Sequence, residues 1–204
     1  MLEDVPSPID LRVMSDAREW EAAAMAKRPW RTEFFERFAV EIGASSVPVR
    51  RILELGSGPG FLADRLLREF RDAAYVALDF SSAMHQLATK RLGPLASRVQ
   101  FVERSLREND WSHALGRFEC VVTNQAVHEL RHKRYATALH VEVRQLLEPG
   151  GAYLVCDHFA GEGGMSNQQL YMSVEEQQSA LRGAGFANVS LLLLKGGLAL
   201  HRAL

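Results

Sequence analysis

One glycine-rich run, residues 52–62 (ILELGSGPGFL), constrains the fold of this chain more than any other segment. It reads as a short apolar strand ending at Leu55, a turn with glycine at alternate positions, and a helix that opens near Leu62. Glycine suits such a turn because it reaches positive φ at little cost and lets a ligand approach bare backbone. A dinucleotide-binding turn has the spacing G-x-G-x-x-G, but Phe61 stands where its third glycine would be, and Glu54 would repel a diphosphate. The run therefore favours a nucleotide-like ligand with a cationic or zwitterionic end.

Beyond this turn, segments with the period of a strand alternate with segments with the period of a helix. The alternation predicts an α/β fold, in which a doubly wound, mainly parallel sheet has helices on both faces. No helix separates the last two strands, so we expect them to pair antiparallel. We expect strands at residues 52–55, 74–78, 99–102, 118–122, 152–156, 189–194 and 198–204, and helices at residues 62–70, 82–92, 132–147 and 173–183.

The N-terminal fifty residues have a different pattern. Residues 16–42 look helical with a break at Pro29, and they carry an aromatic stripe that we interpret as core rather than as a binding wall. The stripe consists of Trp20, Trp30, Phe34, Phe35 and Phe38. We expect residues 1–48 to form an N-terminal helical extension that packs as a cap on a ligand-binding domain at residues 49–204.

Composition excludes several classes of function. Hydrophobic residues make up 47% and charged residues 24% of the 204 residues, as in an ordinary globular domain. The net charge of −1 argues against nucleic acid as a partner, and no apolar run is long enough to span a membrane. Cys120 and Cys156 lie in apolar runs and no Cys/His spacing suits zinc, so we expect no metal. With no secretory leader at the start of the sequence, we expect a cytoplasmic protein.

The ends of the predicted strands are the candidate binding site, because open parallel sheets bind ligands outside the carboxyl ends of their strands. Asp79 ends the second strand, 19 residues after Gly60. A carboxylate at this position can accept hydrogen bonds from both hydroxyls of a ribose. Phe80 follows it and can lie against an adenine ring.

The glycine-rich turn and the segments after it resemble a known family. Residues 54–60 (ELGSGPG) resemble the first motif of the class I S-adenosylmethionine-dependent methyltransferases, and later landmarks follow in that family's order over residues 50–204. The resemblance implies a strand order of 3-2-1-4-5-7-6 with the seventh strand reversed. It implies S-adenosylmethionine as the cofactor and S-adenosylhomocysteine as the product. It also implies that the cofactor contacts Glu54, Gly56, Ser57, Gly58 and Gly60.

Four further cofactor contacts, after the third and fourth strands, depend on the resemblance. Most members of the family have an aspartate where this chain has Ser105, which can still accept from the adenine amino group, and Leu106 can offer its backbone N–H. Asn124 and Gln125 follow the fourth strand, where the family's fourth motif faces the methionine end of the cofactor. The sequence there, Asn-Gln-Ala-Val, lacks the Asn-Pro-Pro-Tyr pattern of enzymes that methylate bases or glutamine.

Three residues are candidates for work on the methyl acceptor. His128 occupies a position where related enzymes have a histidine near the methyl donor, and its ordinary pKa of about 6.5 suits a general base. If a helix starts at Asn124, His128 lies one turn further on the same face. The alternative is a structural histidine bonded to local backbone. Asp157 and His158 leave the fifth strand at the same edge and are candidate acceptor contacts.

We therefore expect methyl transfer from S-adenosylmethionine to a small-molecule acceptor that the motifs do not identify. The loop at residues 161–165 is short and glycine-rich, whereas relatives have substrate-shaping insertions at this place. The site is therefore either open or closed by the N-terminal helices. Two alternatives stay open: an aminopropyl transferase on the same fold, and a non-catalytic cofactor-binding module that acts through a partner protein. The sequence leaves the oligomeric state undetermined.

Overall fold

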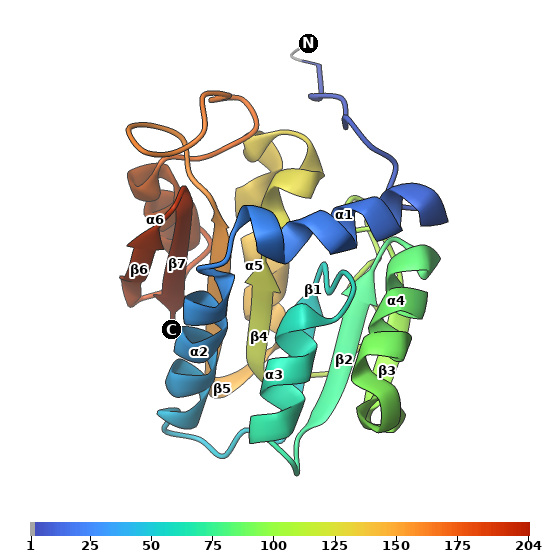
Figure 1. The fold of residues 1–204 in the computed structure, drawn as a ribbon. Helices are drawn as coiled ribbons and strands as arrows, with labels where there is room; N and C mark the ends of the chain where they lie inside the picture. Colours follow the sequence, from blue (N-terminus) through green and yellow to red (C-terminus); the bar gives the residue numbers. More distant parts are fainter. Residues whose placement is uncertain (1–2) are drawn as a thin grey trace.

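A seven-stranded sheet in the order β3-β2-β1-β4-β5-β7-β6 forms the centre of the molecule (Figure 1). The structure is a computed structural model, and it describes residues 3–204. The seven strands are β1 Arg51–Leu55, β2 Ala74–Asp79, β3 Val99–Glu103, β4 Phe118–Asn124, β5 Leu147–His158, β6 Val189–Lys195 and β7 Leu198–Ala203. This order is the one expected from the family resemblance.

The first five strands run parallel, whereas β7 runs antiparallel to both β5 and β6. Gly196 and Gly197 join β6 to β7 with φ of +55° and +79°. Two consecutive residues with positive φ are what a tight hairpin requires, because this turn matches the twist of the paired strands. The expected antiparallel pairing of the last two strands is confirmed.

Helices cover both faces of the sheet (Figure 1). One face packs against α2 Arg31–Gly43, α3 Phe61–Glu69 and α4 Ser82–Leu92; the other packs against α5 Ala136–Leu146 and α6 Val174–Gly183. Serine side chains cap two of these helices: the Ser81 hydroxyl accepts from the Met84 N–H, and Ser173 forms a capping box with Glu176. The doubly wound α/β architecture is confirmed.

The N-terminal helices separate at Pro29, as expected. Helix α1 (Met14–Lys27) lies across the carboxyl ends of the strands, whereas α2 lies flat against the sheet (Figure 1). Phe34, Phe35 and Phe38 of α2 are buried in the core, and Trp20 of α1 instead faces a cavity. The division of the chain at residue 48 stays a prediction.

The segment between β4 and β5 differs from the expected single helix at residues 132–147. It contains 3-10 helices at Val127–Leu130 and Lys133–Tyr135 before α5. Elsewhere in the chain, a 3-10 helix at Gly93–Arg98 connects α4 to β3. Strand β5 begins at Leu147 rather than residue 152, because Phe118 pairs with Leu147 across a shift in register. Gly150, at φ +80°, and Gly151, whose Cβ would lie 2.9 Å from the Glu119 carbonyl oxygen, allow this irregular start. Two glycines that suggested the end of a helix therefore belong to a strand.

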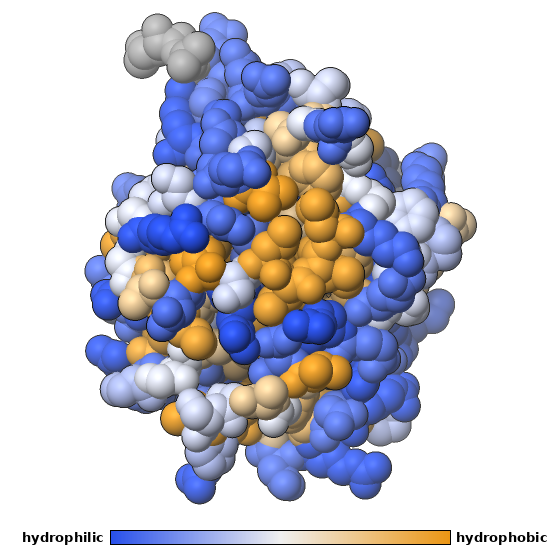
Figure 2. All heavy atoms as spheres, turned by 90° about the vertical axis from the view of Figure 1, so that its left-hand side faces the viewer, coloured by the Kyte–Doolittle hydropathy of each residue, from blue (hydrophilic) through white to orange (hydrophobic). Residues whose placement is uncertain are grey.

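Hydrophobic residues reach the surface on the side of the molecule where β6 forms the edge of the sheet (Figure 2). Leu191 and Leu194 of β6 are 38% and 48% exposed. No helix within residues 3–204 combines the length and the hydropathy needed to cross a membrane.

Candidate functional site

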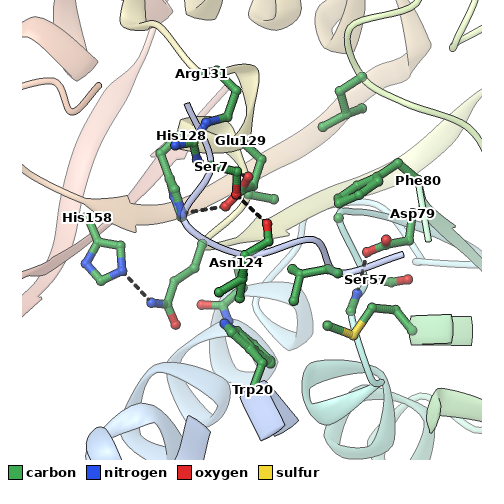
Figure 3. Close-up of a pocket in the computed structure, with 18 of the residues that line it drawn as sticks. Ser7, Trp20, Ser57, Asp79, Phe80, Asn124, His128, Glu129, Arg131 and His158 are labelled. Carbon is green, nitrogen blue, oxygen red and sulfur yellow. Dashed lines mark hydrogen bonds and ion pairs between the residues drawn. The ribbon is translucent and has the colours of Figure 1, made fainter. Parts of the chain in front are cut away.

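A cavity of about 670 Å³ opens at the carboxyl ends of the central strands, beneath α1 and the N-terminal segment (Figure 3). This volume lies in the range of small-molecule sites. The predicted site residues that line it come from the ends of five strands, namely Glu54, Gly56, Ser57, Gly58, Asp79, Phe80, Ser105, Leu106, Asn124, Gln125, His128 and His158. The fold thus brings twelve of the fourteen candidates to one cavity. Gly60 and Asp157 do not line it, although each adjoins residues that do.

The glycine-rich turn between β1 and α3 needs its glycines for two different reasons. Gly56 has φ of +64°, and a Cβ there would collide with the Ala126 side chain. Gly58 has φ of +53°, and a Cβ there would meet no atom within 4 Å. Gly58 therefore presents bare backbone to the cavity, as a close approach by a ligand requires. The Ser57 hydroxyl is buried beside it without a hydrogen-bond partner.

Asp79 ties this turn to the end of β2. Its carboxylate accepts hydrogen bonds from the N–H groups of Gly58 at 2.8 Å and Ser81 at 3.0 Å. Burial raises the pKa of Asp79 to about 6, although these hydrogen bonds act in the opposite direction. Asp79 thus lines the cavity as a carboxylate at neutral pH.

Glu54 is more deeply buried than the sequence suggested. The Tyr75 hydroxyl donates to its carboxyl group at 2.7 Å. Burial raises the pKa of Glu54 to about 8, and the nearby charge of Asp79 adds to the rise. The expected repulsion of a diphosphate by Glu54 is therefore weaker than a charged carboxylate would exert, because the group is mainly neutral at pH 7.

Unpartnered polar atoms gather where β4 ends. The Asn124 and Gln125 side-chain oxygens are buried without hydrogen-bond partners. Gln125 has a left-handed backbone (φ +61°), and its Nε2 lies 2.8 Å from Nε2 of His158. Buried polar atoms without partners are uncommon in proteins and require an explanation. A polar ligand in the cavity would provide partners for both oxygens.

His128 does not lie on a helix that starts at Asn124, because β4 extends through Asn124 and the next helix is a 3-10 turn at Val127–Leu130. Its Nδ1 lies 2.6 Å from Asp157 Oδ1, and its backbone N–H donates to Asp157 Oδ2 at 2.9 Å. On the other side of the ring, Nε2 lies 3.2 Å from Glu129 Oε1 (Figure 3). His128 is therefore held between two carboxylates.

His128 and His158 differ in protonation state because their surroundings differ. Burial alone would lower the pKa of His128, but the charges of Asp157 and Glu129 raise it to about 10. Burial would likewise raise the pKa of Asp157, and the neighbouring His128 outweighs this and lowers it. Burial lowers the pKa of His158 to about 4. At neutral pH His128 is thus an imidazolium and His158 is neutral, contrary to the ordinary pKa expected for His128.

Residues 4–7, which precede α1, are part of the site, whereas only the N-terminal helices were considered as its cover. Arg131 donates from Nε to the Val5 carbonyl at 2.9 Å and from Nη2 to the Pro6 carbonyl at 2.7 Å. Asp4 pairs with Arg107 at 2.6 Å. The chain between these anchors and α1 passes over the cavity, and Ser7 faces it (Figure 3). No local pattern in the sequence signals these contacts, because the partners lie more than 100 residues apart.

Other cavity residues missed from the sequence come from the cap, the segment after β4 and the loop after β5. They are Trp20, Arg28, Arg31, Glu129, Arg131 and Tyr171. Among residues 3–204, no group of three or more His, Cys, Asp or Glu side chains is arranged to hold a metal ion.

Part of the chain is similar in sequence to a known protein family and to curated proteins. Residues 52–151, about half of the chain, match the family model described as "Methyltransferase domain". A malonyl-[acyl-carrier protein] O-methyltransferase from Legionella pneumophila is 30% identical over 112 residues, which cover 55% of this chain and 37% of that protein. The chain thus spans well under half the length of this curated relative.

Solved structures share the fold over nearly the whole chain. An O-methyltransferase family protein from Burkholderia thailandensis superposes with a TM-score of 0.71 at 19% identity, covering 93% of this chain and 59% of that one. The structure of DhpI with S-adenosylhomocysteine superposes with a TM-score of 0.68 at 20% identity, covering 93% of both chains.

Proposed function

We propose that this chain, which carries a class I S-adenosylmethionine-dependent methyltransferase domain, uses the cavity at the carboxyl ends of its strands to methylate a small organic acceptor. The observation that supports the site best is the pairing of Gly58 and Asp79. Gly58 presents open backbone to the cavity, and the carboxylate of Asp79 lies beside it at 2.8 Å. A nucleoside with free ribose hydroxyls suits this pairing of bare backbone and a hydrogen-bond acceptor.

The residues of the cavity fit S-adenosylmethionine. Asp79 would accept from the ribose hydroxyls, Phe80 would pack on the adenine ring, and Ser105 with the Leu106 N–H would contact its edge. The unpartnered oxygens of Asn124 and Gln125 suit the ammonium group at the methionine end. When bound, this cofactor supplies a methyl group activated by a sulfonium, so the protein has mainly to bind, orient and exclude water.

Our proposal for His128 is that it positions the acceptor rather than acting as a general base. A base must be unprotonated to accept a proton, whereas His128 is held as an imidazolium by Asp157 and Glu129. Its ring can donate a hydrogen bond from Nε2 into the cavity when an acceptor competes with Glu129. Neutral His158, which Gln125 contacts, is the better candidate for receiving a proton.

The class of acceptor is proposed from the size of the cavity and from the relatives. The cavity has room for a ligand beside the cofactor-binding residues, and the N-terminal segment and α1 cover it in place of a long insertion at residues 161–165. One curated relative acts on a malonyl group linked to a carrier protein, so free and carrier-linked small molecules both belong in an acceptor screen. Location in the cytoplasm, independence of metals and absence of nucleic acid partners remain predictions.

Calorimetry tests the proposal most directly. We expect S-adenosylmethionine and S-adenosylhomocysteine to bind with one site per chain, and NAD not to bind. Asp64→Ala, on the exposed surface of α3, is a control for Asp79→Ala, because Asp64 pairs only with Arg68 there. Binding of NAD without binding of either sulfur cofactor would refute the proposal. Release of S-adenosylhomocysteine over an acceptor library then tests for turnover.

A further inference from the structure

Two arginines of the cap face the cavity without an anionic partner. Arg28 precedes α2 and Arg31 is its first residue, and both line the cavity. Within residues 3–204, neither guanidinium has a hydrogen-bond or ion-pair partner, and Nε of Arg31 is fully buried. We propose that Arg28 and Arg31 bind a carboxylate of the methyl acceptor. This inference rests on the proposed function, and it makes the acceptor an organic acid.

Arg31 is buried against the Trp20 ring, and no carboxylate within residues 3–204 lies beside it. The side chain is 3% exposed and lies 5.3 Å from that ring. Burial and the like charge of Arg28 lower the pKa of Arg31 to about 10. Burying an unpaired charge costs free energy, and a second cation beside it adds to that cost. An anion that binds between the two arginines would offset both costs.

Other arginines around the cavity differ from this pair, because each already has partners. Arg104 donates to the Trp111 and His113 carbonyl groups, Arg107 pairs with Asp4, and Arg131 holds Glu129 and the N-terminal segment. Their charges and donors serve the fold. The donors of Arg28 and Arg31 remain for a ligand, and a guanidinium suits a carboxylate because both are planar and can form two parallel hydrogen bonds.

Arg28 lies on the side of the cavity away from the residues proposed for the ribose and adenine, so its carboxylate partner is either the acceptor or the methionine end of the cofactor. Its charge acts on His158 and Tyr171, on the side of the cavity where His128 and Asp157 lie. The residues proposed for the ribose and adenine, Asp79 and Ser105, follow β2 and β3 on the other side of β1. S-adenosylmethionine also carries a carboxylate, so the test must separate the two sources.

Calorimetry on Arg28→Gln and Arg31→Met distinguishes a carboxylate of the acceptor from the carboxylate of the cofactor. S-adenosylhomocysteine has the amino acid carboxylate, whereas 5′-methylthioadenosine lacks it. We expect both variants to bind both ligands with wild-type affinity, as Arg68→Gln on the surface of α3 should. If the variants lose affinity for S-adenosylhomocysteine but not for 5′-methylthioadenosine, the arginines bind the cofactor and the inference is wrong. If the wild type binds neither ligand, the proposed function itself fails.

The second measurement compares acids with their neutral amides. Malonate, succinate, benzoate and phenylacetate are titrated into protein saturated with S-adenosylhomocysteine, and each is matched by its primary amide. We expect the acids to bind more tightly than the amides, and we expect each substitution to weaken the acids by about 10- to 150-fold, as loss of a charged hydrogen bond does. Equal binding of acids and amides by the wild type, or an acid preference that survives both substitutions, would overturn the inference.

Thermal unfolding provides a separate check on a structural role. Burying the Arg31 charge without an anion costs more than its contact with the Trp20 ring returns, so the melting temperature of ligand-free Arg31→Met should not fall below that of the wild type. Arg28→Gln, at a less buried position, keeps the binding test usable if Arg31→Met folds poorly. A large fall in both variants, with acid binding intact in the folded fraction, would assign the arginines to the fold.

Discussion

Removal of the Asp157 charge is the sharpest test of the electrostatics of the site. Asp157→Asn keeps the size of the side chain and an oxygen for the His128 N–H, but it removes the charge beside the ring. The rise in the pKa of His128 from 6.5 to about 10 corresponds to at most about 5 kcal/mol of stability. Breaking a buried ion pair by removing one partner costs about 3–5 kcal/mol, which agrees with this bound. We expect Asp157→Asn to lower the free energy of unfolding by that amount at pH 7.

The pH dependence gives the sign of the effect. Because the pKa of His128 is raised in the folded state, its contribution is complete below pH 6.5 and is lost as pH rises towards 10. Urea denaturation at several pH values should show this loss in the wild type and not in Asp157→Asn. Asp64→Asn, which weakens an exposed pair with Arg68, should change the free energy of unfolding by less than about 1 kcal/mol.

The same charge state has a consequence for catalysis. If His128 stays protonated, the rate of methyl transfer at saturating cofactor should not rise through pH 6.5. His128→Ala should lower turnover by less than the 10²–10⁴-fold typical of a lost general base, with cofactor affinity nearly unchanged. NMR titration of the His128 ring measures its pKa directly. A pKa near 6.5, with stability that does not change between pH 6.5 and 10, would refute the reasoning.

Three further outcomes follow from the geometry of the cavity. Asp79→Ala should weaken binding of S-adenosylhomocysteine about 10- to 150-fold by calorimetry. Wild-type affinity should rise from pH 5 to 7, because Asp79 has a pKa of about 6 and accepts hydrogen bonds best as a carboxylate. Unchanged affinity in folded Asp79→Ala would place the ribose elsewhere. Gly58→Val should bind more weakly still, because φ is +53° and the side chain would project into the cavity; a folded variant with wild-type affinity would contradict this. Arg131→Ala should speed tryptic cleavage after Arg12, whose side chain is 70% exposed, because the carbonyl groups of Val5 and Pro6 lose their donor; an unchanged cleavage rate would show that other contacts hold the N-terminal segment.

Much of the fold could be predicted because its signals are local. Alternating strand and helix periods, the G-x-G-x-G turn and the serine caps each act within a few residues. The antiparallel end of the sheet follows from the lack of a helix between β6 and β7. The start of β5 could not be predicted in this way. Its pairing of Leu147 with Phe118 is a contact between distant residues, and it outweighs the local tendency of Pro149 and two glycines to form a turn.

The sequence by itself determined the sheet, the glycine-rich turn and the edge at which polar side chains meet. This edge is predictable because the carboxyl ends of all parallel strands lie on the same side of a sheet. Only the tertiary structure decided the charges at that edge. The protonated state of His128 depends on Asp157, 29 residues away on a neighbouring strand, and the near-neutral state of Glu54 depends on burial. The unpaired charges of Arg28 and Arg31 and the cover formed by the N-terminal segment likewise arise from packing between distant elements. Protonation and pairing depend on the desolvation and neighbours of each group, and these exist only once the chain has folded.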